Sequence, residues 1–247
     1  MLRSFRTARA TLRSLRIYYA DRNRVAAMDR FYGNFVRSGD LVFDVGAHVG
    51  DRVASFRRLG ARVVAVEPQR AMVRTLRLLY GYDRSVTIEA VAVGAQAGRA
   101  RMLINSDNPT VSSMSPAFVE AARGAPGWEA QHWSGSADVA VTTLDALIAR
   151  HGVPAFVKLD VEGFEAEALS GLSQAVRALS FEFTTIQPGV ALACIERCVA
   201  LGYERFNAAL GESQTMIGEW VGAKEIARWL MALPQAANSG DIYAVAA

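Results

Sequence analysis

The chain has 247 residues, of which 51% are hydrophobic, and carries a net charge of +3. This length and hydrophobicity suffice to bury one sizeable core, and α/β chains of this size commonly form a single domain. No run reaches the roughly 18 consecutive apolar residues of a membrane span, and no apolar stretch typical of a secretion signal follows the N-terminal arginines. We therefore expect a soluble, cytoplasmic protein.

The positive charge is concentrated at the N-terminus. Residues 1–40 contain nine arginines and only three acids, Asp21, Asp29 and Asp40. Apolar residues between the arginines would allow contact with an anionic membrane surface or a nucleic acid. However, basic faces are usually only solvated, and the arginines do not alternate regularly with aromatic residues as a base-stacking surface would require. We predict a basic helical segment over residues 1–38 that covers one end of the sheet and has no nucleic-acid partner; weak membrane contact stays open.

From residue 41, short apolar runs alternate with longer helical patterns, which is typical of βαβ units and a parallel sheet. Strands are expected at residues 41–45, 62–66, 86–91, 155–159, 179–183, 203–207 and 241–246, and helices at 52–59, 69–79 and 165–172. The first strands are apolar almost throughout, so helices should cover both faces. The sequence predicts a doubly wound, mostly parallel α/β domain over residues 39–247.

The stretch of about 95–140 interrupts this alternation. A hairpin is expected at 99–104, followed by polar residues and the Gly/Pro-rich run 124–127. Long irregular segments in compact domains are often functional lids, so we interpret this one as a substrate-facing insertion with Trp128, His132 and Trp133 as contacts. The alternative is a surface excursion whose aromatic residues only pack.

A glycine-rich loop follows the first strand. Asp44 ends that strand, and Gly46 and Gly50 would let the backbone approach a ligand closely at the carboxyl edge of the sheet. Glu67 follows the second strand, where an acid can accept hydrogen bonds from both ribose hydroxyls. The loop lacks the G-x-G-x-x-G spacing of dinucleotide sites. These features indicate a cofactor with a ribose and no phosphate, such as S-adenosylmethionine; Asp44 could alternatively only cap the turn.

Five segments together resemble the FkbM family of methyltransferases. They are 41–51, 66–68, 90–94, 142–145 and 156–165, and the last, FVKLDVEGFE, is the most specific. The resemblance runs from about residue 30 to the C-terminus. It implies a class I methyltransferase fold and O-methylation of a hydroxyl on a sugar, glycan or polyketide-type metabolite.

The resemblance also implies roles for individual residues. The cofactor would be bound by Asp44, Gly46, Ala47, His48, Gly50, Glu67 and Ala92. In this assignment the glycine-rich loop lines the methionine end, Glu67 holds the ribose and Ala92 lies against the adenine. Family members often carry a polar residue where this chain has Ala90, so no side chain is assigned to the adenine edge.

The run Lys158-x-Asp160-x-Glu162 leaves the fourth strand at the carboxyl edge. Alternation along the strand would place these three side chains on one side, where they can shift one another's pKa and position a hydroxyl. Methyl transfer to an alcohol requires removal of a proton. We predict that Asp160 is the base or orients the acceptor, with Lys158 and Glu162 as supports; the alternative is a purely structural Lys–carboxylate network.

The remaining candidate residues have weaker signals. Glu182 lies in an apolar strand, where a structural partner is the first interpretation and a role at the acceptor pocket the second. Cys194 and Cys198 are four apart in one expected helix and should be buried free thiols. No His or Cys spacing suits a metal, so we expect none, although Asp160 could hold a divalent ion.

Two other functions remain open from sequence. One is a nicotinamide-dependent oxidoreductase on a related sheet, which the missing phosphate fingerprint disfavours. The other is a non-catalytic module that binds S-adenosylmethionine, which the retained Lys158, Asp160 and Glu162 disfavour. The acceptor and the oligomeric state have no readable motif.

Overall fold

The computed structural model describes the backbone of residues 2–246 and the side chains of residue 7 and residues 9–246. Its main sheet has the strand order β3-β2-β1-β7-β8-β10-β9. The bounds are β1 Leu41–Val45, β2 Arg62–Val66, β3 Val86–Glu89, β7 Phe156–Leu159, β8 Ala178–Thr184, β9 Tyr203–Leu210 and β10 Ser239–Ala246. Only β10 runs antiparallel to its neighbours, β8 and β9. The predicted doubly wound, mostly parallel sheet is confirmed.

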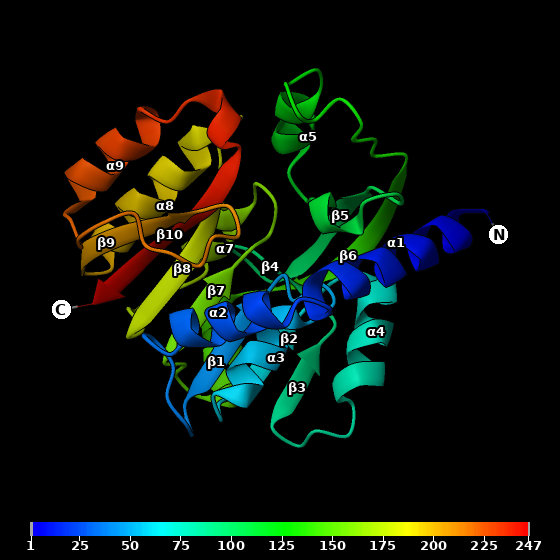
Figure 1. Cartoon of the computed structure of the whole chain (residues 1–247), viewed down its shortest axis with the longest axis horizontal. Coiled ribbons are helices and arrows are strands. Elements are labelled where there is room, and N and C mark those ends of the chain that lie inside the picture. The colour runs from blue at the N-terminus through cyan, green and yellow to red at the C-terminus, as the bar shows by residue number, and fades with distance from the viewer. Residues whose placement is uncertain (1, 247) are drawn as a thin grey trace.

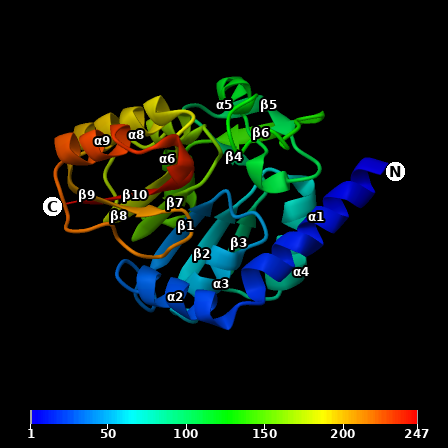
Figure 2. The same cartoon turned by 45° about the horizontal axis from the view of Figure 1, so that its top comes forward.

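Helices cover both faces of this sheet (Figures 1 and 2). One layer holds α1 Leu2–Tyr19, α2 Arg22–Tyr32, α3 Asp51–Arg58 and α4 Arg70–Tyr80; the other holds α6 Leu144–His151, α7 Glu165–Ser170, α8 Pro188–Ala200 and α9 Ala223–Met231. Neighbouring residues of β1 pack against opposite helical layers. Val42 belongs to the core cluster that contains Phe56 of α3, and Phe43 belongs to the cluster that contains Leu147 of α6. A strand buried on both faces must be apolar at successive positions, which explains its composition.

The basic N-terminal segment differs between its two helices. Exposed arginines, Arg9, Arg13 and Arg16, lie along α1. By contrast, α2 and the residues after it contribute Met28, Phe31, Tyr32, Phe35 and Val36 to a buried core cluster. Asp21 caps α2 by accepting hydrogen bonds from the backbone N–H groups of residues 23 and 24. The division into segments 1–38 and 39–247 stays a prediction.

Residues 92–142 build a second, smaller sheet beside the main one. It has the order β4-β6-β5, with β4 Ala92–Val93, β5 Gly98–Ile104 and β6 Gly135–Thr142. The hairpin expected at 99–104 is wrong, because these residues form one strand whose antiparallel partner is β6. The third strand of the main sheet also ends at Glu89 rather than residue 91, and the chain then enters β4. Because β5 and β6 are far apart in the sequence, no short turn motif marks their pairing.

The excursion between β5 and β6 is held together by its aromatic residues. It contains the short helices η1 Pro109–Val111 and α5 Pro116–Ala122. Trp128 is buried, meets Phe118 edge-to-face at 5.3 Å and donates its indole N–H to Asn238 at 3.1 Å. Trp133 donates to the carbonyl of Val111 at 2.7 Å. Both indoles therefore pack and hydrogen-bond within the fold.

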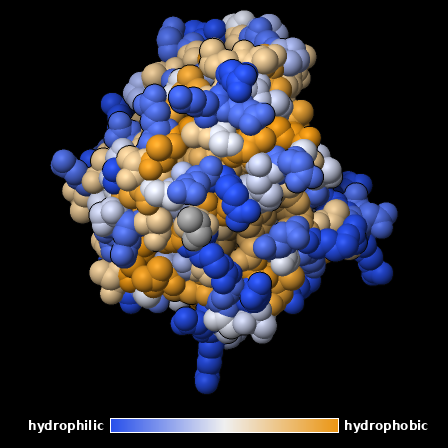
Figure 3. All heavy atoms as spheres, turned by 90° about the vertical axis from the view of Figure 1, so that its left-hand side faces the viewer, coloured by the Kyte–Doolittle hydropathy of each residue, from blue (hydrophilic) through white to orange (hydrophobic). Residues whose placement is uncertain are grey.

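Two further observations concern the thiols and the surface. Cys194 and Cys198 are free and buried in α8, as predicted. Within residues 2–246, no helix combines the length and the hydropathy that crossing a bilayer requires. Figure 3 shows the face on the side of the C-terminus, where projecting hydrophilic side chains alternate with hydrophobic areas.

Candidate cofactor and active site

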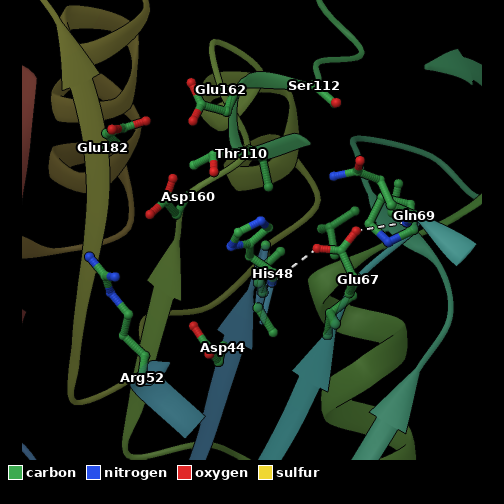
Figure 4. A pocket seen from close by; sticks show the side chains of 18 of the residues that line it. Asp44, His48, Arg52, Glu67, Gln69, Thr110, Ser112, Asp160, Glu162 and Glu182 are labelled. Atoms are coloured by element: carbon green, nitrogen blue, oxygen red, sulfur yellow. Dashed lines mark hydrogen bonds between the residues drawn. The ribbon is translucent and has the colours of Figure 1, made fainter. Parts of the chain in front are cut away.

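A pocket lies at the carboxyl ends of β1, β2 and β7, between the main sheet and the small one. Its walls include most of the residues singled out from the sequence: Asp44, Gly46, Ala47, His48, Glu67, Ala92, Asp160 and Glu162. Gly50 and Lys158 do not line it, and neither do Trp128, His132 and Trp133. Figure 4 shows His48 and Glu67 on one side of this pocket and Asp160, Glu162 and Glu182 on the other.

Gly46 is required where β1 turns toward the pocket. Its φ is +90°, and a Cβ on it would lie 1.8 Å from the carbonyl oxygen of Asp160. Any side chain would therefore collide with the backbone that leaves β7. The glycine lets the two strand ends converge beneath the pocket.

Gly50 supports the same loop from behind. It begins α3 with φ +83°, and a Cβ there would lie 2.7 Å from the ring of Tyr80. The hydroxyl of Tyr80 donates to the carbonyl of Gly50 at 2.7 Å, and that of Tyr19 donates to Val49 at 3.0 Å. The two tyrosines thus connect α4 and α1 to the loop. Gly50 does not line the pocket and contributes by packing behind the loop.

Glu67 holds the glycine-rich loop to the end of β2. Its carboxylate accepts hydrogen bonds from the backbone N–H of His48 at 3.0 Å and of Gln69 at 2.7 Å (Figure 4). Burial raises the pKa of Glu67 to about 7, although these two donors counteract the shift. Each carboxylate oxygen has a second lone pair, so ribose hydroxyls can still donate to it.

Asp44 and His48 present polar atoms that no protein group satisfies. Among the described residues, Oδ2 of Asp44 and Nε2 of His48 are buried without a hydrogen-bond partner. Burial raises the pKa of Asp44 to about 7 and lowers that of His48 to about 4. Buried polar groups are normally paired, so these atoms together with the close backbone approach at Gly46 fit a bound cofactor with polar groups of its own.

Lys158 lies beneath the pocket, 1% exposed. Its ammonium donates to Asp241 of β10 at 2.8 Å and to Asp160 at 3.1 Å. Burial lowers its pKa, but Asp160 and Asp241 outweigh burial and raise it well above the ordinary value. The lysine stays charged and fixes the carboxylate of Asp160 at the pocket floor.

Three carboxylates converge on the β7–β8 side of the pocket. One oxygen from each of Asp160, Glu162 and Glu182 lies within 4.8 Å of the other two. Burial raises the pKa of Glu162 and of Glu182, and the neighbouring acids raise them further. For Asp160, burial is outweighed by Lys158 and Arg52, which hold its pKa below the usual range.

Several lining residues escaped the sequence analysis. Tyr18 reaches the pocket from α1, and Thr110, Ser112 and Met114 reach it from the excursion after β5. Arg52 of α3 forms ion pairs with Asp51 at 2.8 Å and with Glu212, which follows β9, at 2.7 Å. Asp51 ends the motif 41–51 and Arg52 follows it directly, whereas the other residues belong to no motif.

The comparison with protein families decides the identity of the fold and the chemistry. The model of the methyltransferase FkbM domain matches residues 44–230, about three quarters of the chain. The chain belongs to the FkbM methyltransferase family. It is an S-adenosylmethionine-dependent methyltransferase, and the nicotinamide-dependent and non-catalytic alternatives are set aside.

The chain has only distant similarity to individual proteins of known structure. No curated protein matches the chain. It is distantly similar in structure to precorrin-6y C5,15-methyltransferase of Geobacter metallireducens, with 12% identity, a TM-score of 0.44 and coverage of 91% of this chain and 87% of that one. A TehB-like methyltransferase of Corynebacterium glutamicum has 11% identity and a TM-score of 0.44, with coverage of 90% of this chain and 88% of that one. Aeropyrum pernix fibrillarin, which contains S-adenosyl-L-methionine, has 13% identity and a TM-score of 0.42, with coverage of 85% of this chain and 68% of that one.

Proposed function

We propose that this FkbM-family methyltransferase methylates a hydroxyl group of a sugar, glycan or polyketide-type metabolite. The observation that supports this acceptor class most directly is the wall formed by Asp160, Glu162 and Glu182. Lys158 and Arg52 hold the pKa of Asp160 below its usual range, and its ionised carboxylate accepts the hydrogen bonds that hydroxyls donate. Thr110 and Ser112 on the facing excursion add hydroxyls that both donate and accept.

The cofactor binds on the β1–β2 side of the pocket in this proposal. Asp44, Gly46, Ala47 and His48 hold its methionine end, with Gly50 positioning the loop from behind. Glu67 accepts hydrogen bonds from the ribose hydroxyls, and Ala92 lies against the adenine. When bound, S-adenosylmethionine would supply an electrophilic methyl group on a sulfonium, whose sulfur–methyl bond breaks in the transfer and leaves the neutral thioether S-adenosylhomocysteine.

The residues of the chain must then align a hydroxyl and accept its proton. In-line approach to the methyl carbon demands a fixed acceptor, and Lys158 fixes Asp160 through their 3.1 Å contact. As the new oxygen–carbon bond forms, the hydroxyl proton passes to a carboxylate of the pocket. Asp160 receives the proton or orients the hydroxyl, and Lys158 and Glu162 support it.

A panel of matched acceptors tests this proposal. Purified enzyme is incubated with S-adenosylmethionine and with polyol sugars, their deoxy analogues and their amino analogues, and the products are identified by mass spectrometry. We expect methylation of a compound that carries the hydroxyl and none of its deoxy partner. Methylation of amino analogues only would overturn the hydroxyl assignment while leaving the enzyme class intact.

A further inference from the structure

We propose that Asp160, Glu162 and Glu182 form a binding site for one divalent cation of the Mg²⁺, Mn²⁺ or Ca²⁺ type. The site itself rests on the geometry of the cluster; only its use in methyl transfer rests on the proposed function. The sequence shows no metal-ligand spacing, because the three acids come from different elements. Asp160 follows β7, Glu162 lies in the turn before α7, and Glu182 is on β8.

The spacing of the oxygens suits a shared ion. Two ligands of one ion are at most twice the metal–oxygen distance apart, which is about 4.2 Å for Mg²⁺ and about 4.6–5.2 Å for Ca²⁺. The three oxygens lie within 4.8 Å of one another, which is inside the Ca²⁺ range and a few tenths of an ångström above the Mg²⁺ limit. An all-carboxylate set is also the donor chemistry of hard divalent cations.

Two of the carboxylates lack the partners that buried acids normally have. Glu162 is 6% exposed, and within the described part of the chain its carboxylate takes part in no hydrogen bond or ion pair. Oε2 of Glu182 is likewise buried without a hydrogen-bond partner among these residues. Figure 4 shows both side chains pointing into the same space beside Asp160. A buried polar group without a partner is costly, so this space suits a ligand that accepts electron pairs.

The neighbouring cations cannot neutralise the cluster. Lys158 is divided between Asp160 and Asp241, and Arg52 between Asp51 and Glu212. Three carboxylates therefore share part of one positive charge. A divalent ion restores the balance and leaves coordination positions for water and for an acceptor.

In methyl transfer, such an ion would bind the acceptor oxygen and make its proton easier to remove. The proton would pass to a carboxylate of the pocket, and the acceptor oxygen would gain the methyl group. This deepens the role of the cluster without changing the reaction.

Mn²⁺ binding to the full chain, followed by electron paramagnetic resonance without cofactor or acceptor, tests the site. The protein is first freed of metal with EDTA. We expect one equivalent of bound Mn²⁺, displaced by Mg²⁺ or Ca²⁺. Glu162→Gln and Glu182→Gln should each weaken binding about tenfold or more. Glu167→Gln is the matched control, because Glu167 is an exposed acid of the neighbouring helix α7.

Absence of Mn²⁺ binding to the wild type at millimolar concentration would overturn the proposal, as would equal binding by all three variants. If a Gln variant fails to fold, thermal unfolding of the wild type decides: a bound ion raises Tm, and no shift with any of the three metals rejects the site. Because the titration contains no acceptor, its failure does not affect the proposed hydroxyl methylation.

Discussion

The two sides of the pocket differ in the hydrogen bonds that their glutamates receive. On the β1–β2 side, Glu67 accepts two hydrogen bonds from the backbone of the loops beside it. On the β7–β8 side, Glu162 and Glu182 crowd against Asp160, and Lys158 is shared with Asp241. The first side is built by the backbone and preorganised for a neutral, hydroxyl-bearing group. The second concentrates negative charge that only a ligand or a proton can relieve.

This difference separates binding from chemistry. A site whose donors and acceptors are already fixed loses little when a cofactor enters, which favours affinity. A cluster of crowded acids costs stability in the empty protein but can orient a hydroxyl and accept its proton. Changes on the first side should therefore act on cofactor affinity, and changes on the second on turnover.

The largest effect on stability should come from Gly46→Ala, which removes the close approach that joins the two sides. The methyl group would overlap the carbonyl of Asp160 at a φ of +90°. We expect a loss of about 3 kcal/mol in the free energy of unfolding, from steric overlap and from the left-handed backbone together. Urea denaturation and titration with S-adenosylmethionine measure the loss of stability and of binding.

Gly39→Ala is the matched control. Gly39 has a φ of +87° but no atom within 4 Å of its added Cβ, so only the backbone cost of about 1–2 kcal/mol remains. Equal destabilisation by the two substitutions would show that contact with Asp160 does not matter.

Asp160→Asn should separate turnover from binding on the β7–β8 side. The amide keeps the size of the side chain but is a poor proton acceptor, so we expect turnover to fall about 10²- to 10⁴-fold with cofactor affinity nearly unchanged. Single-turnover kinetics and calorimetric titration measure the two quantities. Thermal unfolding is needed as well, because Asn weakens the pairing of the buried Lys158. Unchanged turnover would remove Asp160 from the chemistry.

Glu67→Ala should act on the other side and weaken cofactor binding. The substitution removes the ribose acceptor and leaves the N–H groups of His48 and Gln69 without it, a cost of about 1–3 kcal/mol or roughly 5- to 150-fold in Kd. Isothermal titration with S-adenosylmethionine measures this, with NAD and NADP as comparison ligands that should not bind. An unaltered Kd would contradict the ribose role.

The smallest effect should be a pH dependence of cofactor affinity. The pKa of Glu67 is raised to about 7, and ribose hydroxyls donate best to the ionised form. Affinity should therefore increase by up to about tenfold from pH 6 to pH 8, and Glu67→Gln should reduce this dependence to the part that comes from Asp44, whose pKa is also about 7. An affinity that falls with rising pH would reverse the assignment.

The same shift has the opposite sign for the stability of the cofactor-free protein. The folded state binds the proton of Glu67 more tightly than the unfolded state does, so its contribution to stability is present below the ordinary pKa of 4.5. This contribution is lost as the pH rises through about 7. Urea midpoints of the wild type and Glu67→Gln at pH 5 and pH 8 measure the contribution.

Much of the fold and the position of the β1–β2 side of the pocket could be predicted because their signals are local. The apolar run 41–43, followed by Asp44, Gly46 and Glu67 in that order, indicates a strand, a loop and an acid at one sheet edge. The small sheet was harder to predict from the sequence, because β5 pairs with β6 across the excursion 105–134. The hairpin expected at 99–104 failed for this reason.

The sequence by itself determined the doubly wound sheet, the family and the segment that carries the glycine-rich loop, since hydrophobic periodicity and short motifs depend on neighbours along the chain. Only the tertiary structure decided that Glu182 of β8 joins Asp160 and Glu162, that Lys158 is shared with Asp241 of β10, and that Tyr18 of α1 lines the pocket. These contacts join residues far apart in the chain, and their charges act through space and burial, which no one-dimensional pattern contains.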